Sequence, residues 1–313
     1  MTQQFYSNGK LLLTGEYAVL DGALSCALPS KYGQTLTINE VASPLLFWTS
    51  LDEKGEKWFN TSLHLDLFRN SEVDVSNELE NLRASEDNVS EMLFRILLEA
   101  KRLNPDFLME EIGYEVQTRL SFPREWGLGS SSTLINNVAQ WANVDPFTLL
   151  SKTFNGSGYD IACAQHNHPI LYQLKDGEPF IEEVEFNPPF KDALYFVHLN
   201  RKQNSREGIS RYREKEFDKE TLIKTISELT KECISCIEIN RFKELMNKHE
   251  SLLADILKLR PVKDRLFKDF EGSVKSLGAW GGDFVLAIGD TDTPEYFFKK
   301  GFKTVIPYEQ MIL

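Results

Sequence analysis

A glycine-rich loop that leads into a helix is the part of this sequence best suited to chemistry. Residues 123–133 read Pro-Arg-Glu-Trp-Gly-Leu-Gly-Ser-Ser-Ser-Thr. Gly127 and Gly129 permit backbone angles closed to other residues, and the first-turn N–H groups of a helix lack internal partners, so this segment can bind an anion. Three serine hydroxyls follow where a phosphate and its metal would lie. The pattern predicts a phosphate site, and a serine-capped helix after a turn is the alternative.

The loop must be held by a strand before it and a helix after it. Residues 113–120 alternate as a strand. Leu134, Ile135 and Val138 recur at helical spacing, which predicts a helix that ends near Asn143. The sequence therefore predicts a strand, a phosphate loop and a helix in direct succession.

The remaining elements indicate an α+β fold, because strands and helices are mixed rather than strictly alternating. Pro188-Pro189 is a plausible boundary, which gives an N-terminal domain of residues 1–187 and a C-terminal domain of residues 188–313. The other expected strands are 11–13, 35–38, 45–49, 57–59, 193–199 and 284–288, and the other expected helices are 87–103, 218–238, 241–258 and 262–276.

Two further motifs make the chain recognisable. Gly9-Lys10 is followed by Gly15-Glu16-Tyr17-Ala18-Val19, and Gly278-Ala279-Trp280-Gly281-Gly282-Asp283 lies near the C-terminus. The loop at residues 123–133 lies between these two motifs. The three segments, in this order along the chain, resemble the signatures of the GHMP kinases. This superfamily of small-molecule kinases includes galactokinase, homoserine kinase, mevalonate kinase and phosphomevalonate kinase. The resemblance covers nearly the whole chain.

The resemblance implies an ATP-dependent enzyme that uses Mg²⁺, with an N-terminal nucleotide-binding domain and a C-terminal ferredoxin-like domain. Asp160 would be the base, Lys10 would keep Asp160 ionised and face the migrating phosphoryl group, and the Ser131 hydroxyl would touch Mg²⁺. Asp160 could instead only cap a helix, and Glu16 could be a capping carboxylate. The residues expected to hold the nucleotide are Gly127, Leu128, Gly129, Ser130, Ser131 and Ser132, and those expected near the substrate are Glu16, Tyr17, Arg206, Arg211, Gly281, Gly282 and Asp283.

Two segments narrow the resemblance to the mevalonate branch. Residues 156–164 resemble the Gly-Ser-Gly-x-Asp-x-Ala segment of mevalonate and phosphomevalonate kinases, and residues 242–253 resemble the Leu-Met-Asn helix of mevalonate kinases. The expected acceptor is mevalonate or 5-phosphomevalonate. A decarboxylase of the diphosphomevalonate type, a sugar or homoserine kinase and a degenerate nucleotide-binding regulator stay open as alternatives.

The chain departs from the family pattern at three places. Mevalonate kinases use an upstream glutamate as a second metal ligand, but residues 146–155 contain none. Trp280 stands where the family turn has glycine, and Trp126 replaces a small residue beside the loop. These differences bear on metal binding and on the size of the acceptor site.

The charge balance constrains the partners. The net charge of −12 argues against nucleic acid. An anionic acceptor then needs a local basic cluster, and residues 201–215 carry six basic residues against two acidic ones, with Arg206 and Arg211 among them. A solvated helix face is the alternative for this segment.

The cysteines and the apolar pattern indicate a cytoplasmic protein. Four cysteines in 313 residues do not form a disulfide framework, which fits a reducing compartment. No signal core and no apolar run of membrane-spanning length is visible. We expect a monomer or a homodimer with no membrane partner.

Overall fold

The computed structural model describes residues 1–70, 75, 80, 88–154, 156–201 and 205–313. It contains two compact units, and each is assembled from three segments, whereas the sequence suggested one boundary near residue 188. The two long N-terminal strands and the glycine-rich loop pass from one unit to the other. Unit 1 comprises Met1–Asn8, Tyr32–Arg124 and Gly129–Gln165, and unit 2 comprises Gly9–Lys31, Glu125–Leu128 and His166–Leu313.

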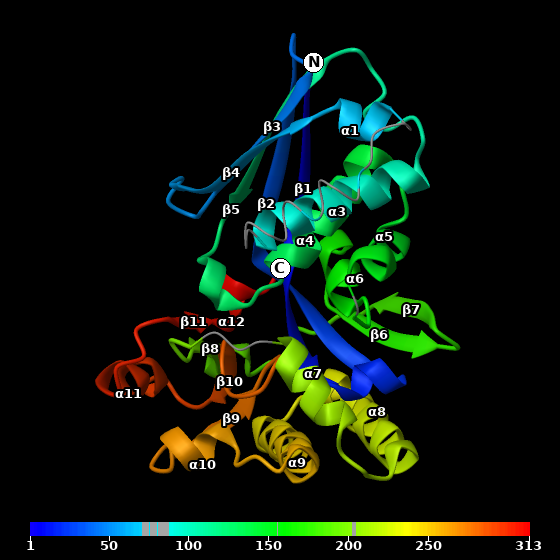
Figure 1. Cartoon of the computed structure of the whole chain (residues 1–313). Coiled ribbons are helices and arrows are strands. Elements are labelled where there is room, and N and C mark those ends of the chain that lie inside the picture. Colours follow the sequence, from blue (N-terminus) through cyan, green and yellow to red (C-terminus); the bar gives the residue numbers. More distant parts are fainter. Residues whose placement is uncertain (71–74, 76–79, 81–87, 155, 202–204) are drawn as a thin grey trace. The chain divides into compact units, whose positions relative to one another are not determined.

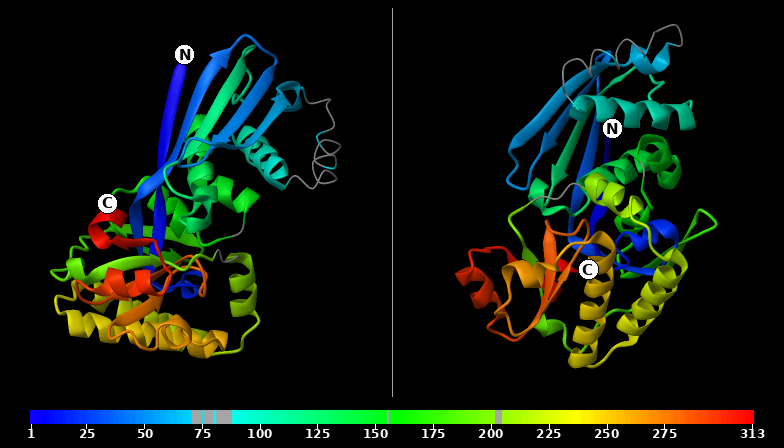
Figure 2. Two further views of the ribbon diagram at one scale, coloured as in Figure 1. Left: turned by 90° about the vertical axis from the view of Figure 1, so that its left-hand side faces the viewer. Right: turned by 60° about the horizontal axis from the view of Figure 1, so that its bottom comes forward.

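Unit 1 is a sheet with helices packed on it. Its strand order is β4-β3-β5-β2, in which β3 and β5 are parallel and the other pairs are antiparallel. Figure 2 shows α3 and α4 on one face of this sheet. The elements that contribute to unit 1 are β1 (Thr2–Thr14), β2 (Ser25–Val41), β3 (Leu45–Leu51), β4 (Lys57–His64), α1 (Asp66–Arg69), α3 (Asn88–Leu103), β5 (Gly113–Leu120), η2 (Arg124–Trp126), α4 (Ser130–Ala142), α5 (Pro146–Thr153) and α6 (Tyr159–Gln165).

Hydrophobic patterning explains the covered face of unit 1. In β5 the side chains of Val116 and Leu120 are buried and those of Glu115 and Gln117 are exposed, as expected for a strand with one solvated face. Apolar residues of α3 and α4 pack into the same core as Val116. The predicted end of the helix near residue 143 is confirmed, because Asn143 caps α4 in the left-handed conformation with φ of 52°.

Unit 2 contains an antiparallel four-stranded sheet in the order β11-β8-β10-β9 (Figure 1). Phe267 and Phe297 pack with Val197 and Val285 to form its apolar core. The amino-terminal part of β2 pairs with β6, which pairs with β7. The remaining elements are η1 (Ala18–Asp21), β6 (Ile170–Lys175), β7 (Glu178–Glu183), η3 (Lys191–Ala193), β8 (Leu194–His198), α7 (Ser205–Arg213), α8 (Lys219–Ser235), α9 (Ile239–Leu257), α10 (Val262–Leu266), β9 (Ser273–Ser276), β10 (Phe284–Ile288), α11 (Thr293–Lys299), β11 (Val305–Pro307) and α12 (Tyr308–Met311).

The predicted helix over residues 262–276 is wrong. Helix α10 ends at Leu266, and residues 273–276 form β9, which pairs with β10. The reason lies at Gly272, where a Cβ atom would come within 2.2 Å of the Ile288 carbonyl oxygen. Glycine disfavours a helix interior and here permits the close approach of two backbones, so the chain extends into a strand.

Among the described residues, none of the helices combines the length and the apolar character that crossing a membrane requires.

Candidate active site

The hydroxyl-bearing residues in the first turn of α4 differ in exposure. Ser131 is exposed, whereas Ser132 and Thr133 are buried at 6% and 1% exposure. The Thr133 hydroxyl donates to Gln34 Oε1 at 2.8 Å and is thereby committed to the interior of unit 1. Gly129 precedes the helix in the left-handed conformation with φ of 88°, which glycine adopts without strain. The half-buried Ser130 hydroxyl, the exposed Ser131 hydroxyl and the first-turn N–H groups are the parts of this turn that can meet a ligand.

Unit 1 brings Asp160 to the same helix turn. Asp160 lies in the first turn of α6, and the Ser132 hydroxyl donates a hydrogen bond to Asp160 Oδ2. The other carboxylate oxygen, Oδ1, accepts the backbone N–H of Ile161 at 3.1 Å. The structure therefore joins two residues that the sequence analysis selected separately.

Unit 2 holds the first half of the glycine-rich loop against β1. The Lys10 backbone N–H donates to the Leu128 carbonyl oxygen at 3.0 Å, and Lys10 Nζ donates to the Gly127 carbonyl oxygen at 3.2 Å. Trp126 packs edge-on against Phe284 of β10, with ring centroids 5.4 Å apart. The position of Lys10 thus depends on the loop that it helps to fix.

The turn after β9 also reaches this loop within unit 2. A Cβ atom at Gly127 would come within 2.4 Å of Asp283 Cγ, so only glycine fits there without displacement. Gly278, Trp280, Gly281 and Asp283 all have positive φ, at 64°, 52°, 99° and 53°. Residues in this conformation are typical of backbone that turns its N–H groups toward an anion. The predicted residues Gly127 and Asp283 are therefore in direct proximity.

Trp280 is the unusual residue of this turn. Its side chain is 3% exposed, and its indole Nε1 has no hydrogen-bond partner among the described residues. A non-glycine residue with positive φ is uncommon and costs conformational energy. Tryptophan thus occupies a position where glycine would be less strained.

Glu16 belongs to a buried network in unit 2 that the sequence analysis did not anticipate. Its carboxylate is paired with the ammonium of Lys275, and both side chains have 0% exposure. On α9, Glu250 accepts the Ser276 N–H at 3.0 Å and the Ser276 hydroxyl at 2.8 Å. His249 Nε2 accepts the Gly15 N–H at 2.9 Å. The network therefore ties the Gly-Glu-Tyr motif to α9 and β9.

The protonation states of this network follow from burial. His249 is neutral, because burial and the neighbouring Lys275 charge lower its pKa and because its Nε2 already accepts a hydrogen bond. The 3.4 Å approach of His249 Nε2 to Glu16 Oε2 is therefore not an ion pair. Burial raises the pKa of Glu16 to about 7 despite the opposing Lys275 charge, and burial also raises the pKa of Glu250.

We expect Glu16→Gln to change the pH dependence of stability between pH 4.5 and 7. In this window the folded protein binds a proton at Glu16 more tightly than the unfolded chain does, so Glu16 makes the free energy of unfolding fall as the pH rises. From pH 4.5 to pH 7 the free energy of unfolding of the wild type should therefore fall by on the order of 3 kcal/mol relative to that of Glu16→Gln. Urea unfolding of both proteins at several pH values measures the difference, and parallel curves would contradict it. His249 adds the opposite slope below pH 6.5 in both proteins, so it cancels in the comparison.

Tyr17 and helix α7 lie together in unit 2. The rings of Tyr17 and Tyr212 stack with centroids 5.5 Å apart, and the Tyr212 hydroxyl donates to Asp21 Oδ2 at 2.7 Å. A Cβ atom at Gly208 would come within 2.4 Å of the Tyr17 hydroxyl oxygen. Helix α7, which contains Arg206 and Arg211, is thus packed against the Gly-Glu-Tyr motif.

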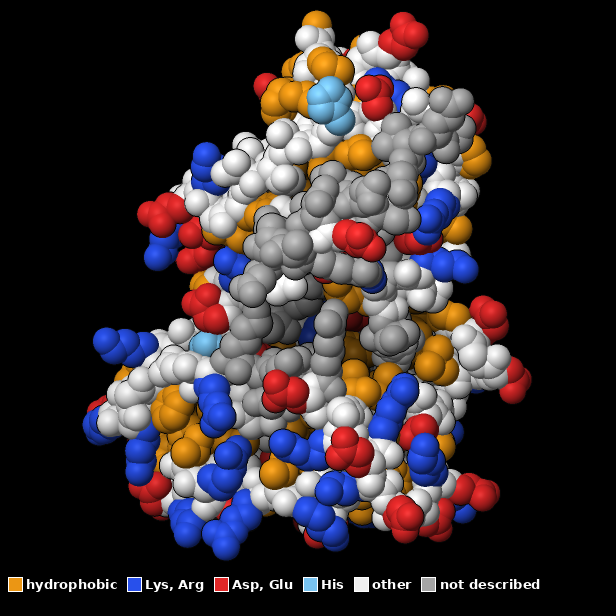
Figure 3. Space-filling model, viewed as in Figure 1, with side chains coloured by type: hydrophobic (Ala, Val, Ile, Leu, Met, Phe, Trp, Pro, Cys, Tyr) orange, Lys and Arg blue, Asp and Glu red, His pale blue; other side chains and the backbone are white. Residues whose placement is uncertain are grey.

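Of the two predicted arginines, only Arg211 has a described side chain. Arg211 is half-buried, and the side chain of Arg206 lies outside the described residues. The two positions are about 140° apart around the helix axis. Figure 3 shows that lysine and arginine side chains also lie over α8 to α10, mixed with acidic ones. The acidic chain therefore offers basic surface in unit 2.

The donor set fits a magnesium ion that arrives with a nucleotide. No group of three or more histidine, cysteine, aspartate or glutamate side chains that could hold a metal occurs among the described residues. Magnesium is usually held by few protein ligands together with substrate phosphates and water. The exposed Ser131 hydroxyl at the start of α4 is compatible with that mode.

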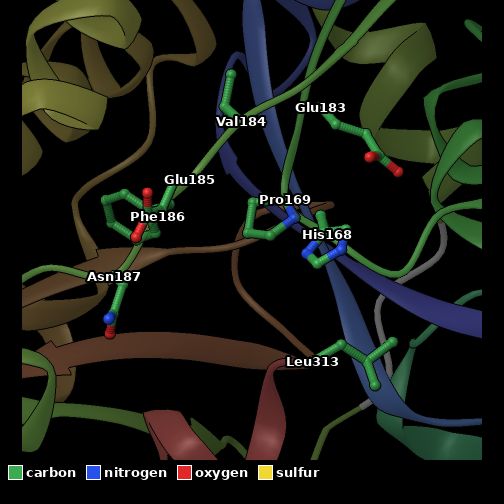
Figure 4. A pocket seen from close by; sticks show the side chains of 8 residues that line it. All are labelled: His168, Pro169, Glu183, Val184, Glu185, Phe186, Asn187 and Leu313. Carbon is green, nitrogen blue, oxygen red and sulfur yellow. The ribbon is translucent and has the colours of Figure 1, made fainter.

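A separate cavity of about 470 Å³ lies in unit 2 and shares no residue with the predicted site (Figure 4). Glu183 and Glu185 contribute to its wall, so an anionic nucleotide would be repelled there. Its lining residues are His168, Pro169, Glu183, Val184, Glu185, Phe186, Asn187 and Leu313.

Sequence reasoning missed Lys275 and Glu250. No local pattern marked them, because residues 262–276 were expected to form a helix and the burial of every side chain in Ser273–Ser276 appears only in the structure. A lysine is seldom buried without a partner. The acidic partner Glu16 is 259 residues away in the sequence. The pairing could therefore not be read from local spacing.

The structure is similar to several solved kinases, although the sequence matches no protein-family profile and no curated protein. Mevalonate kinase from Methanococcus jannaschii is 16% identical, with a TM-score of 0.68 over 96% of this chain and 94% of that chain. Phosphomevalonate kinase from Streptococcus pneumoniae, solved with phosphomevalonate and AMPPNP, is 16% identical, with a TM-score of 0.63 over 95% of both chains. Galactokinase from Lactococcus lactis, solved with galactose, is 14% identical, with a TM-score of 0.65 over 96% of this chain and 88% of that chain. The chain therefore has the α+β fold of the GHMP kinases.

Proposed function

We propose that this protein is an ATP-dependent kinase that phosphorylates mevalonate or 5-phosphomevalonate. The observation that carries the proposal is the contact between the first turn of α4 and Asp160, which puts a carboxylate beside a candidate phosphate-binding turn. The motif order in the sequence and the fold shared with mevalonate and phosphomevalonate kinases support it.

The proposed roles follow from what phosphoryl transfer requires. Backbone N–H groups from Gly127 to Ser132 hold the β- and γ-phosphates, and the positive end of α4 favours their charge. Ser131 contributes its hydroxyl to Mg²⁺, which when bound neutralises phosphate charge. Lys10 supplies a further positive charge, and Gly281, Gly282, Asp283 and Tyr17 belong to the acceptor side. Glu16 is buried and paired with Lys275, so it supports the Gly-Glu-Tyr motif from within.

The proposed transfer is a single displacement. The attacking atom is a hydroxyl oxygen in mevalonate and an oxygen of the 5-phosphate in 5-phosphomevalonate. It forms a bond to the γ-phosphorus of ATP, the bond from that phosphorus to the β,γ-bridging oxygen breaks, and ADP leaves with the electron pair. With mevalonate, the proton of the attacking hydroxyl moves to the Asp160 carboxylate and then to water. With 5-phosphomevalonate the attacking phosphate oxygen is already ionised, and Asp160 has the orienting role alone. Asp160 can play this part because both its oxygens are held by donors within unit 1.

An ADP-release screen tests the proposal. Mevalonate, 5-phosphomevalonate, diphosphomevalonate, homoserine and several sugars are offered with ATP and Mg²⁺, and ADP, inorganic phosphate and CO₂ are measured. We expect ADP release that depends on mevalonate or 5-phosphomevalonate. Release of CO₂ from diphosphomevalonate would identify a decarboxylase, turnover with a sugar or homoserine would identify a different acceptor, and ATP binding without turnover would indicate a regulator.

Two substitutions should separate the phosphate loop from an ordinary capped turn. Ser131→Ala removes the hydroxyl proposed for Mg²⁺, and Gly129→Val places a β-branched residue at a φ of 88° in the loop. We expect each to lower kcat/KM for ATP by about 10-fold or more, because phosphate and metal contacts are lost. Steady-state kinetics at varied ATP and Mg²⁺ measures this effect. Unchanged ATP use in both variants would show that the turn does not bind phosphate.

Replacing Arg206 and Arg211 together by alanine tests the acceptor side. We expect KM for the acceptor to rise by about 10-fold or more and KM for ATP to stay within a factor of about two, because charge-assisted hydrogen bonds to an anionic acceptor are lost. Arg213→Ala, an exposed arginine of the same helix, is the matched control. A larger effect with 5-phosphomevalonate than with mevalonate favours a phosphate-binding role, and an unchanged acceptor KM leaves the segment as a solvated surface.

A further inference from the structure

Ser132 differs from the two serines before it in what its hydroxyl contacts. Its side chain is buried, and its hydroxyl donates to Asp160 Oδ2. A serine hydroxyl has one proton to donate. While Ser132 donates that proton in its hydrogen bond to Asp160, its side chain cannot also donate to a phosphate oxygen. Its side chain therefore acts on the carboxylate and not on the nucleotide.

The contact joins two helix starts. Ser132 lies in the first turn of α4 and Asp160 in the first turn of α6, both in unit 1. The backbone N–H of Ile161 holds Oδ1, but that donor belongs to the residue next to Asp160 and moves with it. The Ser132 hydroxyl is the donor that fixes the carboxylate relative to the phosphate-binding turn.

A fixed carboxylate matters for proton transfer. A base must lie within hydrogen-bond reach of the proton it takes, and small misplacements reduce the rate. An aspartate side chain without a second donor can rotate about its χ angles. Ser132 is also part of the turn proposed to hold the phosphates. One residue can therefore fix the position of the carboxylate relative to the γ-phosphate.

We infer that Ser132 is a positioning residue that orients the Asp160 carboxylate through its hydroxyl while its backbone N–H faces the nucleotide phosphates. The inference rests on the proposed function and adds to it different roles for two neighbouring serines. The Ser131 hydroxyl binds Mg²⁺, and the Ser132 hydroxyl holds the Asp160 carboxylate.

The test is a double-mutant cycle of Ser132→Ala and Asp160→Asn. We expect Ser132→Ala to lower kcat by about 10-fold or more with the Kd for AMPPNP within a factor of about two, because orientation of the base is lost and phosphate binding is kept. In the Asp160→Asn background the same substitution should change kcat by less than about 2-fold, since no base remains to be oriented. Ser132→Thr keeps the hydroxyl, so its kcat should be close to that of the wild type and well above that of Ser132→Ala.

Thr133→Val is the matched control. It removes a buried hydroxyl from the same helix turn, where Thr133 donates to Gln34. We expect it to lower Tm without a selective loss of kcat. A comparable loss of kcat in Thr133→Val would overturn the inference, because it would show that any defect in this turn has the same effect.

The remaining outcomes are also decisive. An undiminished effect of Ser132→Ala in the Asp160→Asn background, or weaker AMPPNP binding in Ser132→Ala, would overturn the inference. So would an unchanged kcat in Ser132→Ala while Asp160→Asn is impaired, and in that case the proposed function stands. If Asp160→Asn itself turns over like the wild type, the proposed base role fails, and the inference fails with it.

Discussion

Asp160→Asn should lower kcat by about 100-fold or more and leave the Kd for ATP within a factor of about two. Asparagine has nearly the same size and keeps an oxygen that can accept the Ser132 hydroxyl, but its amide cannot take up the proton of the acceptor. General-base and orienting roles act mainly in the transition state, so the loss should appear in kcat. Steady-state kinetics and nucleotide titration measure the two quantities.

A second aspartate in unit 1 supplies the control for this substitution. Asp145 caps α5, where its Oδ2 accepts the Thr148 N–H at 2.6 Å. Asp145→Asn should cost at most about 1 kcal/mol of stability and should not change kcat selectively. Wild-type turnover by Asp160→Asn would remove Asp160 from the mechanism, whereas a loss shared by both variants would point to a general effect of carboxylate removal.

Lys275→Met should reduce the free energy of unfolding by about 3–5 kcal/mol. The Lys275 ammonium is fully buried, is paired with Glu16, and donates to the Ser276 carbonyl oxygen at 2.9 Å. Its charge also lowers the pKa of Glu250, so both buried carboxylates lose their counter-charge in the variant. Urea unfolding followed by circular dichroism measures the change.

Two comparisons make the Lys275 result specific. Adding Glu16→Gln to Lys275→Met should recover part of the loss, because one of the uncompensated carboxylates is then neutral. Lys219→Met breaks an exposed pair with Asp21 and should cost about 1 kcal/mol or less. Equal effects of Lys275→Met and Lys219→Met would contradict the assigned buried network.

Local patterns predicted much of the fold. The strand at Gly113–Leu120 and the helix after the loop were both readable, because an alternating strand and an amphipathic helix have distinct periods. The same reasoning failed at residues 273–276. There the deciding contact is the approach of the Ile288 carbonyl to Gly272, which is not a local property of the sequence.

The candidate site was predictable in its parts but not in its contacts. The motifs marked Ser132, Asp160, Lys10 and Gly127, yet neither the bond from Ser132 to Asp160 nor that from Lys10 to Gly127 follows from spacing. Those contacts join residues 28 and 117 positions apart. They depend on how α4 packs beside α6 and on how β1 runs along the loop.

Transfer of label from ATP labelled in its γ-phosphate tests the central claim most directly. The protein is incubated with labelled ATP, Mg²⁺ and either mevalonate or 5-phosphomevalonate, and the products are separated. We predict that the label appears in the acceptor in an amount equal to the ADP formed. Label that appears only in inorganic phosphate, or no label transfer to either acceptor while ATP is bound, would contradict the account.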